Sequence, residues 1–79
     1  MDNRTLVKNL FASNLRAERA RKNYTQEQLS ELAEISTEYL SRIENERVSP
    51  TIQVVANIAL ALGVSLDTLL PLEILKKNG

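Results

Sequence analysis

Apolar residues recur at helical spacing along most of the chain, and short polar segments separate the helical patterns. The first pattern predicts a helix over residues 5–22. Asn23 is expected to end it, because asparagine tolerates the left-handed backbone conformation found just past many helices. The apolar stripe of this helix comprises Leu6, Val7, Leu10, Phe11 and Leu15. No segment alternates apolar and polar residues as a strand does, so the sequence predicts an all-α fold.

Two hydroxyl residues mark where the second and third helices begin. Thr25 precedes a helical pattern over residues 26–33, and Gln28 stands three residues later, as in a capping box. Ser36 precedes a pattern over residues 37–45 in the same way. We therefore expect Thr25 and Ser36 to be the N-caps of two short helices.

Two further helices are expected in the second half of the chain. The fourth should end just before Gly63, and its N-cap is either Ser49 or Thr51. Ser65 is expected to cap a short fifth helix, which Pro71 limits or kinks. The chain length allows one domain, so we predict a single five-helix domain.

Only residues 34–36 separate the second helix from the third, and an interval this short forces the two helices to cross steeply. Ile35 is apolar within the turn, and Ser30 is small where the helices must approach closely. The other apolar positions of the unit are Leu29, Ala33, Leu40 and Ile43. Residues 26–45 therefore predict a helix-turn-helix, a unit that places its second helix in the major groove of DNA.

The third helix carries a continuous polar face opposite its apolar positions. Its members are Thr37, Glu38, Ser41, Arg42 and Asn45, with Tyr39 at the edge. Such side chains donate or accept the hydrogen bonds that read base edges in the major groove. A merely solvated face is the commoner explanation for an amphipathic helix, but the tight turn before this helix favours DNA binding.

Two charged residues interrupt the apolar stripes. Arg19 lies four residues after Leu15, and Glu44 lies four residues after Leu40. Both side chains should point inward, and we predict that they pair and tie the first helix to the third. The alternative is two independent surface charges. Removing one partner from a buried pair is strongly destabilising, even where the pair itself adds no net stability.

Composition narrows the possible functions. The 79 residues contain neither cysteine nor histidine, which excludes the usual zinc sites, cysteine nucleophiles and histidine-based triads. We therefore expect no enzyme activity, no metal and no cofactor. No apolar run is long enough for a membrane span or a secretion signal, which predicts a soluble, cytoplasmic protein without a membrane partner.

Charge is balanced overall but unevenly distributed. Ten basic and ten acidic residues give a net charge of zero, which argues mildly against a nucleic-acid partner. Residues 1–24 nevertheless carry six basic residues and two acidic ones, so the distribution is more informative than the sum. The zero sum also favours an alternative function, in which the domain is a protein–protein interaction module.

Three stretches, TQEQLSELA, LSRIEN and ALGVSLDTLL, together resemble the Cro/phage-repressor (XRE) type of helix-turn-helix transcriptional regulators. The resemblance runs from Leu15 to Leu70, about two-thirds of the chain. It implies a lambda-repressor-like domain that binds a double-stranded DNA operator. The short chain is similar to stand-alone members of the family such as restriction-modification controller proteins.

The resemblance also implies individual roles. The position matching Gln26 contacts phosphate, those matching Thr37, Glu38, Ser41 and Arg42 face the bases, and those matching Asn45 and Arg47 grip the backbone. The family's internal ion pair matches Arg19 and Glu44, in agreement with their spacing. By their hydrogen-bonding groups, Arg42 suits guanine and Glu38 suits the cytosine amino group. Tyr39 suits a phosphate or a thymine methyl group.

The sequence departs from the family pattern at two positions where glycine is usual, Glu34 in the turn and Glu46 at the end of the third helix. If Glu34 has a positive φ, it carries strain of about 1 kcal/mol. Glu46 adds negative charge near the DNA phosphates, which weakens the backbone contact expected there.

The tail over residues 66–77 carries more apolar side chains than a short terminal helix needs to cover its own domain. We expect a homodimer through Leu66, Leu69, Leu70, Leu72, Ile74 and Leu75. The alternative is that the tail folds back as core. The two recognition helices of a dimer would lie about 34 Å apart, on the half-sites of a palindromic operator.

These observations favour a dimeric repressor or controller protein and no second, ligand-sensing domain. An antitoxin that represses its own operon is an alternative that needs a toxin partner, and no toxin-binding extension is visible. Activation would need a surface for RNA polymerase, and the sequence identifies none.

Overall fold

The five helices predicted from apolar spacing are present in the computed structural model, which describes residues 2–73. They are α1 (Asn3–Arg21), α2 (Gln26–Ala33), α3 (Thr37–Glu44), α4 (Ile52–Leu62) and α5 (Leu66–Leu69), and this range contains no strand. The all-α fold is thereby confirmed. Ile74 and Leu75, which were expected in a dimer interface, lie outside the described residues.

Side-chain caps define where each helix begins. The N-caps are Asp2, Thr25, Ser36, Thr51 and Ser65. Each accepts a hydrogen bond from the backbone amide three residues later, which satisfies a donor that the helix itself leaves unpaired. The capping box of Thr25 and Gln28 is complete, with both of its hydrogen bonds present. Of the two alternatives for α4, Thr51 is the cap.

Helix ends differ slightly from the prediction. Helix α1 begins two residues earlier than expected, because Asp2 accepts from the Thr5 amide at 2.8 Å. Helix α3 ends at Glu44 rather than Asn45, which is its C-cap. Left-handed residues follow α1 and α4, with a φ of 59° at Asn23 and 70° at Gly63. Both had been predicted to end these helices.

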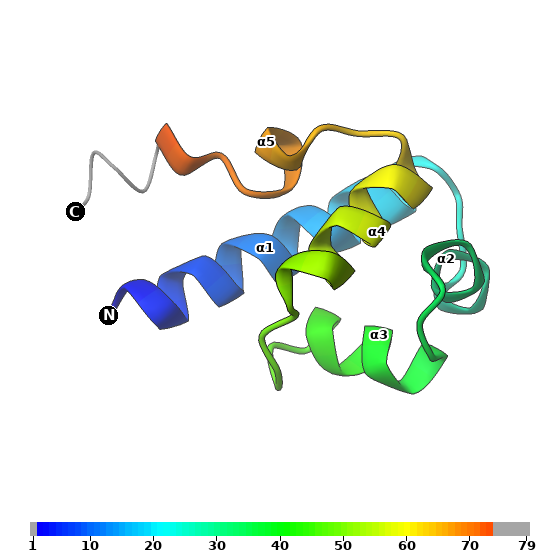
Figure 1. Cartoon of the computed structure of the whole chain (residues 1–79), viewed down its shortest axis with the longest axis horizontal. Helices are drawn as coiled ribbons and strands as arrows, with labels where there is room; N and C mark the ends of the chain where they lie inside the picture. The colour runs from blue at the N-terminus through cyan, green and yellow to red at the C-terminus, as the bar shows by residue number, and fades with distance from the viewer. Residues whose placement is uncertain (1, 74–79) are drawn as a thin grey trace.

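One core joins all five helices. Its fully buried large side chains are Leu15, Leu29, Leu40, Ile43, Ile58, Leu62 and Leu69. Helix α2 packs against both α3 and α4, while α1 packs against α3 and α5. In Figure 1, α2 is seen nearly end-on while α3 lies across the view, so the two cross steeply, as the short turn predicted. None of the described helices is long and apolar enough to cross a membrane.

Leu69 corrects one expectation. Its side chain is fully buried, and its carbonyl accepts a hydrogen bond of 3.0 Å from Asn14 Nδ2 of α1. Leu69 therefore belongs to the core of its own chain and is not available to a dimer interface. Leu66 and Leu72 are exposed, and Leu70 is half-buried, so the tail divides between core and surface.

Candidate nucleic-acid interface

A left-handed residue closes the turn between α2 and α3. Glu34 has φ 60° and ψ 40°, and the Ile35 amide donates to the Ser30 carbonyl at 3.0 Å. Ser36 then caps α3 by accepting from the Tyr39 amide at 3.0 Å. Glu34 therefore has a positive φ, the condition under which a side chain at this position carries strain.

Contacts with α2 fix the rotation of α3 about its own axis. Leu40 and Ile43 are buried on the inner side of α3. At the start of the helix, Thr37 Oγ1 lies 2.9 Å from the hydroxyl of the buried residue Ser30. A larger side chain at Ser30 would separate the helices here. This packing turns the polar positions of α3 away from the core.

The α3 polar face, defined as Thr37, Glu38, Ser41, Arg42 and Asn45, is exposed unevenly. Glu38, Arg42 and Asn45 are exposed, whereas Thr37, Ser41 and the neighbouring Tyr39 are half-buried. Asn45 Nδ2 donates to the Ser41 carbonyl at 2.9 Å, so this amide is held close to the helix. Tyr39 packs against the core. The exposed groups of the face are therefore the charged side chains of Glu38 and Arg42, with the Asn45 amide held against the helix beside them.

Glu38 and Arg42 form an ion pair one helical turn apart. Arg42 Nη2 lies 2.7 Å from Glu38 Oε1. The Arg42 side chain is 57% exposed and the Glu38 side chain is 76% exposed. The sequence analysis assigned these residues to separate bases and did not predict the pair. Their spacing of four residues was the signal that could have revealed it.

A second ion pair joins the inner side of α3 to α1. Arg19 Nε lies 2.7 Å from Glu44 Oε2, and Arg19 Nη2 lies 3.0 Å from Glu44 Oε1. The Glu44 side chain is 3% exposed and that of Arg19 is 23% exposed. The predicted pair is thus confirmed, in the two-pronged geometry that arginine makes with a carboxylate.

Three other groups converge on the same buried pair. Gln26 Nε2 donates to Glu44 Oε1 at 2.9 Å, Arg19 Nη1 donates to the Tyr24 carbonyl at 3.0 Å, and Arg16 Nη1 donates to the Glu44 carbonyl. Within residues 2–73, no buried side-chain nitrogen or oxygen is left without a partner. Sequence reasoning missed Gln26 and Arg16 as members of this network, although Arg16 lies one turn before Arg19.

The network holds the positive charge of Arg19 in place. The hydrogen bond to Glu44 raises the pKa of Arg19 above its ordinary value, against the opposing effect of burial. Because the pKa of Arg19 is higher in the folded than in the unfolded protein, its bond to Glu44 stabilises the fold fully below the ordinary pKa of arginine. This stabilisation would be lost only as the pH rises through the raised pKa. Titration of Arg19 therefore adds no pH dependence to stability near neutrality.

The segment after α3 presents a further cation. Glu46 adopts a left-handed conformation with φ 62°, and the Arg47 amide then donates to the Arg42 carbonyl at 2.9 Å. Arg47 is exposed and Glu46 is half-buried. This geometry ends α3 in the way that glycine usually allows, and it leaves the Arg47 side chain at the surface beside the end of α3.

The chemistry of this surface is hydrogen bonding and charge pairing. Within residues 2–73, no group of three or more acidic side chains is placed to hold a metal ion. The α3 polar face offers a guanidinium, a carboxylate, hydroxyls and an amide. These are the groups with which proteins read base edges and contact phosphates.

Comparisons with known proteins agree with this geometry. The profile of a helix-turn-helix family matches residues 15–69, which is more than half of the chain. The chain therefore belongs to this helix-turn-helix family, of the XRE type. No curated protein matches the chain.

Solved structures include several with the same fold. A hypothetical transcription factor NHTF from Neisseria is 32% identical, with a TM-score of 0.79 over 90% of this chain and 84% of that one. The clp gene regulator ClgR from C. glutamicum is 27% identical, with a TM-score of 0.78 over 92% and 94%. The restriction-modification controller C.AhdI from Aeromonas hydrophila, 24% identical, shares the fold with a TM-score of 0.76 over 78% and 94%.

Family, fold and surface together define the class. The protein is a DNA-binding transcriptional regulator with a helix-turn-helix, and it is not an enzyme.

Proposed function

We propose that this protein is a dimeric transcriptional regulator that reads a palindromic operator through α3. One observation carries the proposal: buried Leu40 and Ile43 hold α3 so that Glu38, Ser41 and Arg42 face outward. A helix presented in this way fits the major groove and brings its side chains to base edges. The similar proteins NHTF and ClgR are described as a hypothetical transcription factor and a clp gene regulator, which supports the same function.

The proposed contacts divide between bases and backbone. Arg42 suits the O6 and N7 acceptors of guanine, and Glu38 suits the amino group of cytosine. Ser41 and Thr37 supply hydroxyls beside them, although the Thr37 hydroxyl already interacts with Ser30. Tyr39, at the edge of the face, is proposed to contact phosphate or a thymine methyl group.

Backbone contacts are proposed at the two ends of the motif. Gln26 begins α2, and one of its two amide N–H groups is used by Glu44, so the second remains for a phosphate oxygen. Asn45 and Arg47 lie at the end of α3, where Arg47 is exposed. Contacts of this kind set the register of the protein on DNA, whereas base contacts set the sequence preference.

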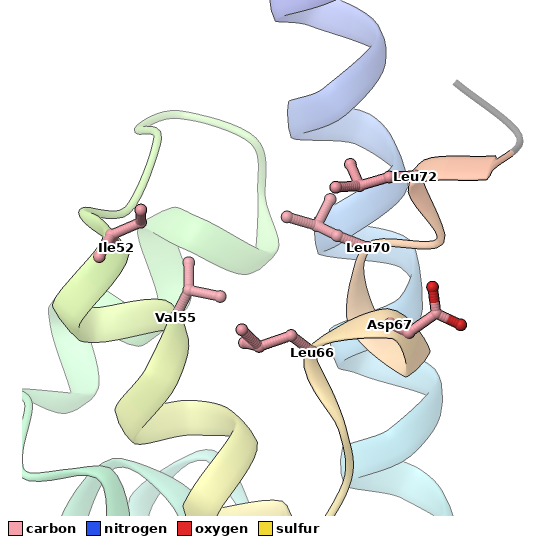
Figure 2. A pocket seen from close by; sticks show the side chains of 6 residues that line it. All are labelled: Ile52, Val55, Leu66, Asp67, Leu70 and Leu72. Atoms are coloured by element: carbon pink, nitrogen blue, oxygen red, sulfur yellow. The ribbon is translucent and has the colours of Figure 1, made fainter. Parts of the chain in front are cut away.

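A second copy is proposed to bind at the groove between α4 and α5. The groove has a volume of about 360 Å³ and is lined by Ile52, Val55, Leu66, Asp67, Leu70 and Leu72. In Figure 2, Leu66 points from α5 toward Val55 of α4, whereas Asp67 points away. Ile52 is 89% exposed, and Leu66 and Leu72 are 54% and 56% exposed. Apolar surface of this kind, gathered in one place, is typical of an interface.

A dimer explains how so small a domain could recognise a site. One recognition helix reads only a few base pairs, and two helices about 34 Å apart read two half-sites on the same side of DNA. The proposed interface consists of three residues of the tail and one of α4, which are Leu66, Leu70, Leu72 and Ile52. The similar proteins NHTF, ClgR and C.AhdI come from bacteria, whose DNA lies in the cytoplasm, and we propose the same location for this protein.

Sedimentation with one matched pair of variants tests the dimer. Ile52 lines the groove, whereas Leu60, also on α4 and 81% exposed, does not. Ile52→Ser should raise the dimer dissociation constant about tenfold, because it removes an apolar side chain that the second copy would cover. Leu60→Ser should leave that constant unchanged. A wild-type protein that is strictly monomeric at micromolar concentrations contradicts the proposed dimer.

Salt dependence tests DNA binding itself. A protein that neutralises several phosphates releases counterions, so its affinity for DNA should fall steeply as salt rises. A protein–protein interaction module should show little binding to DNA at any salt concentration. Fluorescence anisotropy of the full chain with a random-sequence duplex over a salt series distinguishes the two functions.

A further inference from the structure

The most accessible charges on the α3 polar face compensate each other. Glu38 and Arg42 bond at 2.7 Å although both side chains are more than half exposed. An exposed pair at this spacing contributes little to folding, so stability of the fold does not require it. The pair lies on the face that is proposed to meet DNA, so its main effect should be on DNA binding.

The bond leaves both residues able to contact DNA at the same time. A guanidinium has five N–H donors, and the bond to Glu38 uses one of them, on Nη2. One N–H on Nη1 and the second on Nη2 remain for the O6 and N7 atoms of guanine. Glu38 is bonded through Oε1, so Oε2 can accept a hydrogen bond from a base. The pair can therefore dock on DNA without separating.

Electrostatics restricts where such a pair can bind. An unpaired Arg42 would be attracted to any phosphate, whereas the carboxylate of Glu38 is repelled by phosphates and by acceptor atoms of bases. In the major groove, the amino group of cytosine has an acceptor on one side only, O6 of the paired guanine, whereas the amino group of adenine lies between two acceptors, its own N7 and O4 of the paired thymine. The carboxylate is thus accommodated best by cytosine.

The spacing of the two residues indicates adjacent base pairs. One helical turn advances about 5.4 Å, and successive bases of a DNA strand lie about 3.4 Å apart. Because the Glu38 and Arg42 side chains converge at their bond, their tips are closer than one turn. That separation matches neighbouring base pairs better than distant ones.

We propose that Glu38 is a specificity-determining residue that positions Arg42 on guanine and accepts from cytosine in the adjacent base pair. Each half-site then contains two successive G·C pairs. Glu38 also lowers affinity for unrelated DNA, because it offsets the charge of Arg42. This inference rests on the proposed function, since it requires that α3 read DNA.

The test compares sequence selection by three full-length proteins: wild type, Glu38→Gln and Glu31→Gln. The Glu31 variant is the control, because it removes the same charge from an exposed position on α2. Duplexes bound from a random pool are sequenced for each protein. Affinities for the wild-type consensus and for a scrambled duplex are then measured, together with the melting temperature of each protein.

For wild type we expect two adjacent G·C pairs in each half-site. Glu38→Gln should bind the scrambled duplex several-fold more tightly and should lower the ratio of consensus to scrambled affinity about tenfold. It should lose the cytosine preference and weaken the guanine preference, because Arg42 is no longer held by a charged partner, with an almost unchanged melting temperature. Glu31→Gln should keep the wild-type sequence preference and ratio.

Three results would overturn the inference. A wild-type consensus without adjacent G·C pairs contradicts the assigned bases. A Glu38→Gln protein with an unchanged consensus and affinity ratio contradicts the role of Glu38, while the proposed function stands because wild type still selects a site. If wild type selects no sequence at all, the proposed function fails and this inference fails with it.

Discussion

Two glutamates of α3, Glu44 and Glu38, each form an ion pair with an arginine. The shortest nitrogen–oxygen distance is 2.7 Å in both pairs, but one pair is enclosed and the other is exposed to solvent. Glu44 faces inward, where it is enclosed by Arg19 and Gln26. Glu38 faces solvent and has Arg42 as its partner. Burial rather than distance decides what each pair does, because water competes for the exposed pair and is excluded from the enclosed one. The inner pair supports the structure of the motif, and the outer pair is available to DNA.

Glu44→Ala should have the largest effect on stability. It leaves the Arg19 guanidinium and the Gln26 amide without their buried partner, and we expect a loss of about 3 kcal/mol in the free energy of unfolding. Urea denaturation followed by circular dichroism measures this. The double variant Arg19→Met/Glu44→Leu should recover part of the loss, because no buried charge is then unpaired. A single variant as stable as wild type would contradict the structural role of the inner pair.

Arg42→Ala should affect binding rather than folding. Its side chain is mostly exposed, so the melting temperature should change little. The free energy of binding to the preferred duplex should weaken by about 1–3 kcal/mol, the usual contribution of an arginine bound to guanine through two hydrogen bonds. Anisotropy titrations with the preferred and scrambled duplexes measure both affinities. Unfolding of this variant, or an equal loss on both duplexes, would contradict the assignment to base reading.

Glu34→Gly tests whether the left-handed backbone conformation at position 34 lowers the stability of the fold. Glycine removes the strain of a φ near 60°, but it also increases the freedom of the unfolded chain. We expect the free energy of unfolding to rise by about 0.5–1 kcal/mol and DNA binding to be retained. Glu31→Gly, within helical α2, should instead be destabilising by about 1 kcal/mol. A lowered melting temperature for Glu34→Gly would count against the turn geometry.

Glu38→Ala should have the smallest effect on stability. Loss of an exposed pair one helical turn apart costs about 0.3–0.5 kcal/mol. Thermal unfolding of Glu38→Ala beside Glu44→Ala measures the contrast between outer and inner pairs directly. Equal losses in the two variants would show that burial does not separate their roles.

The sequence predicted those features that depend on local spacing. Thr25 with Gln28, Ser36 and Gly63 mark helix ends through backbone hydrogen bonds a few residues away. The pairing of Arg19 with Glu44 could also be predicted, because each interrupts an apolar stripe that must face the core. For Arg19 and Glu44 the helical period determines where each side chain points.

Other features depend on distances that the sequence does not contain. The long side chains of Arg16 and Gln26 could reach several acceptors, and only the packed structure selects Glu44 for both. The division of the tail was missed for a different reason. Helix α5 has four residues, too few for periodicity to distinguish buried Leu69 from exposed Leu66.

The most direct test of the account is a competition experiment with the full-length protein and a duplex selected from a random pool. We predict that wild type, at low salt, retains the selected duplex against an excess of scrambled competitor. Arg42→Ala should remain folded and lose this preference. Folded wild-type protein that releases both duplexes equally would contradict the claim that α3 reads base sequence.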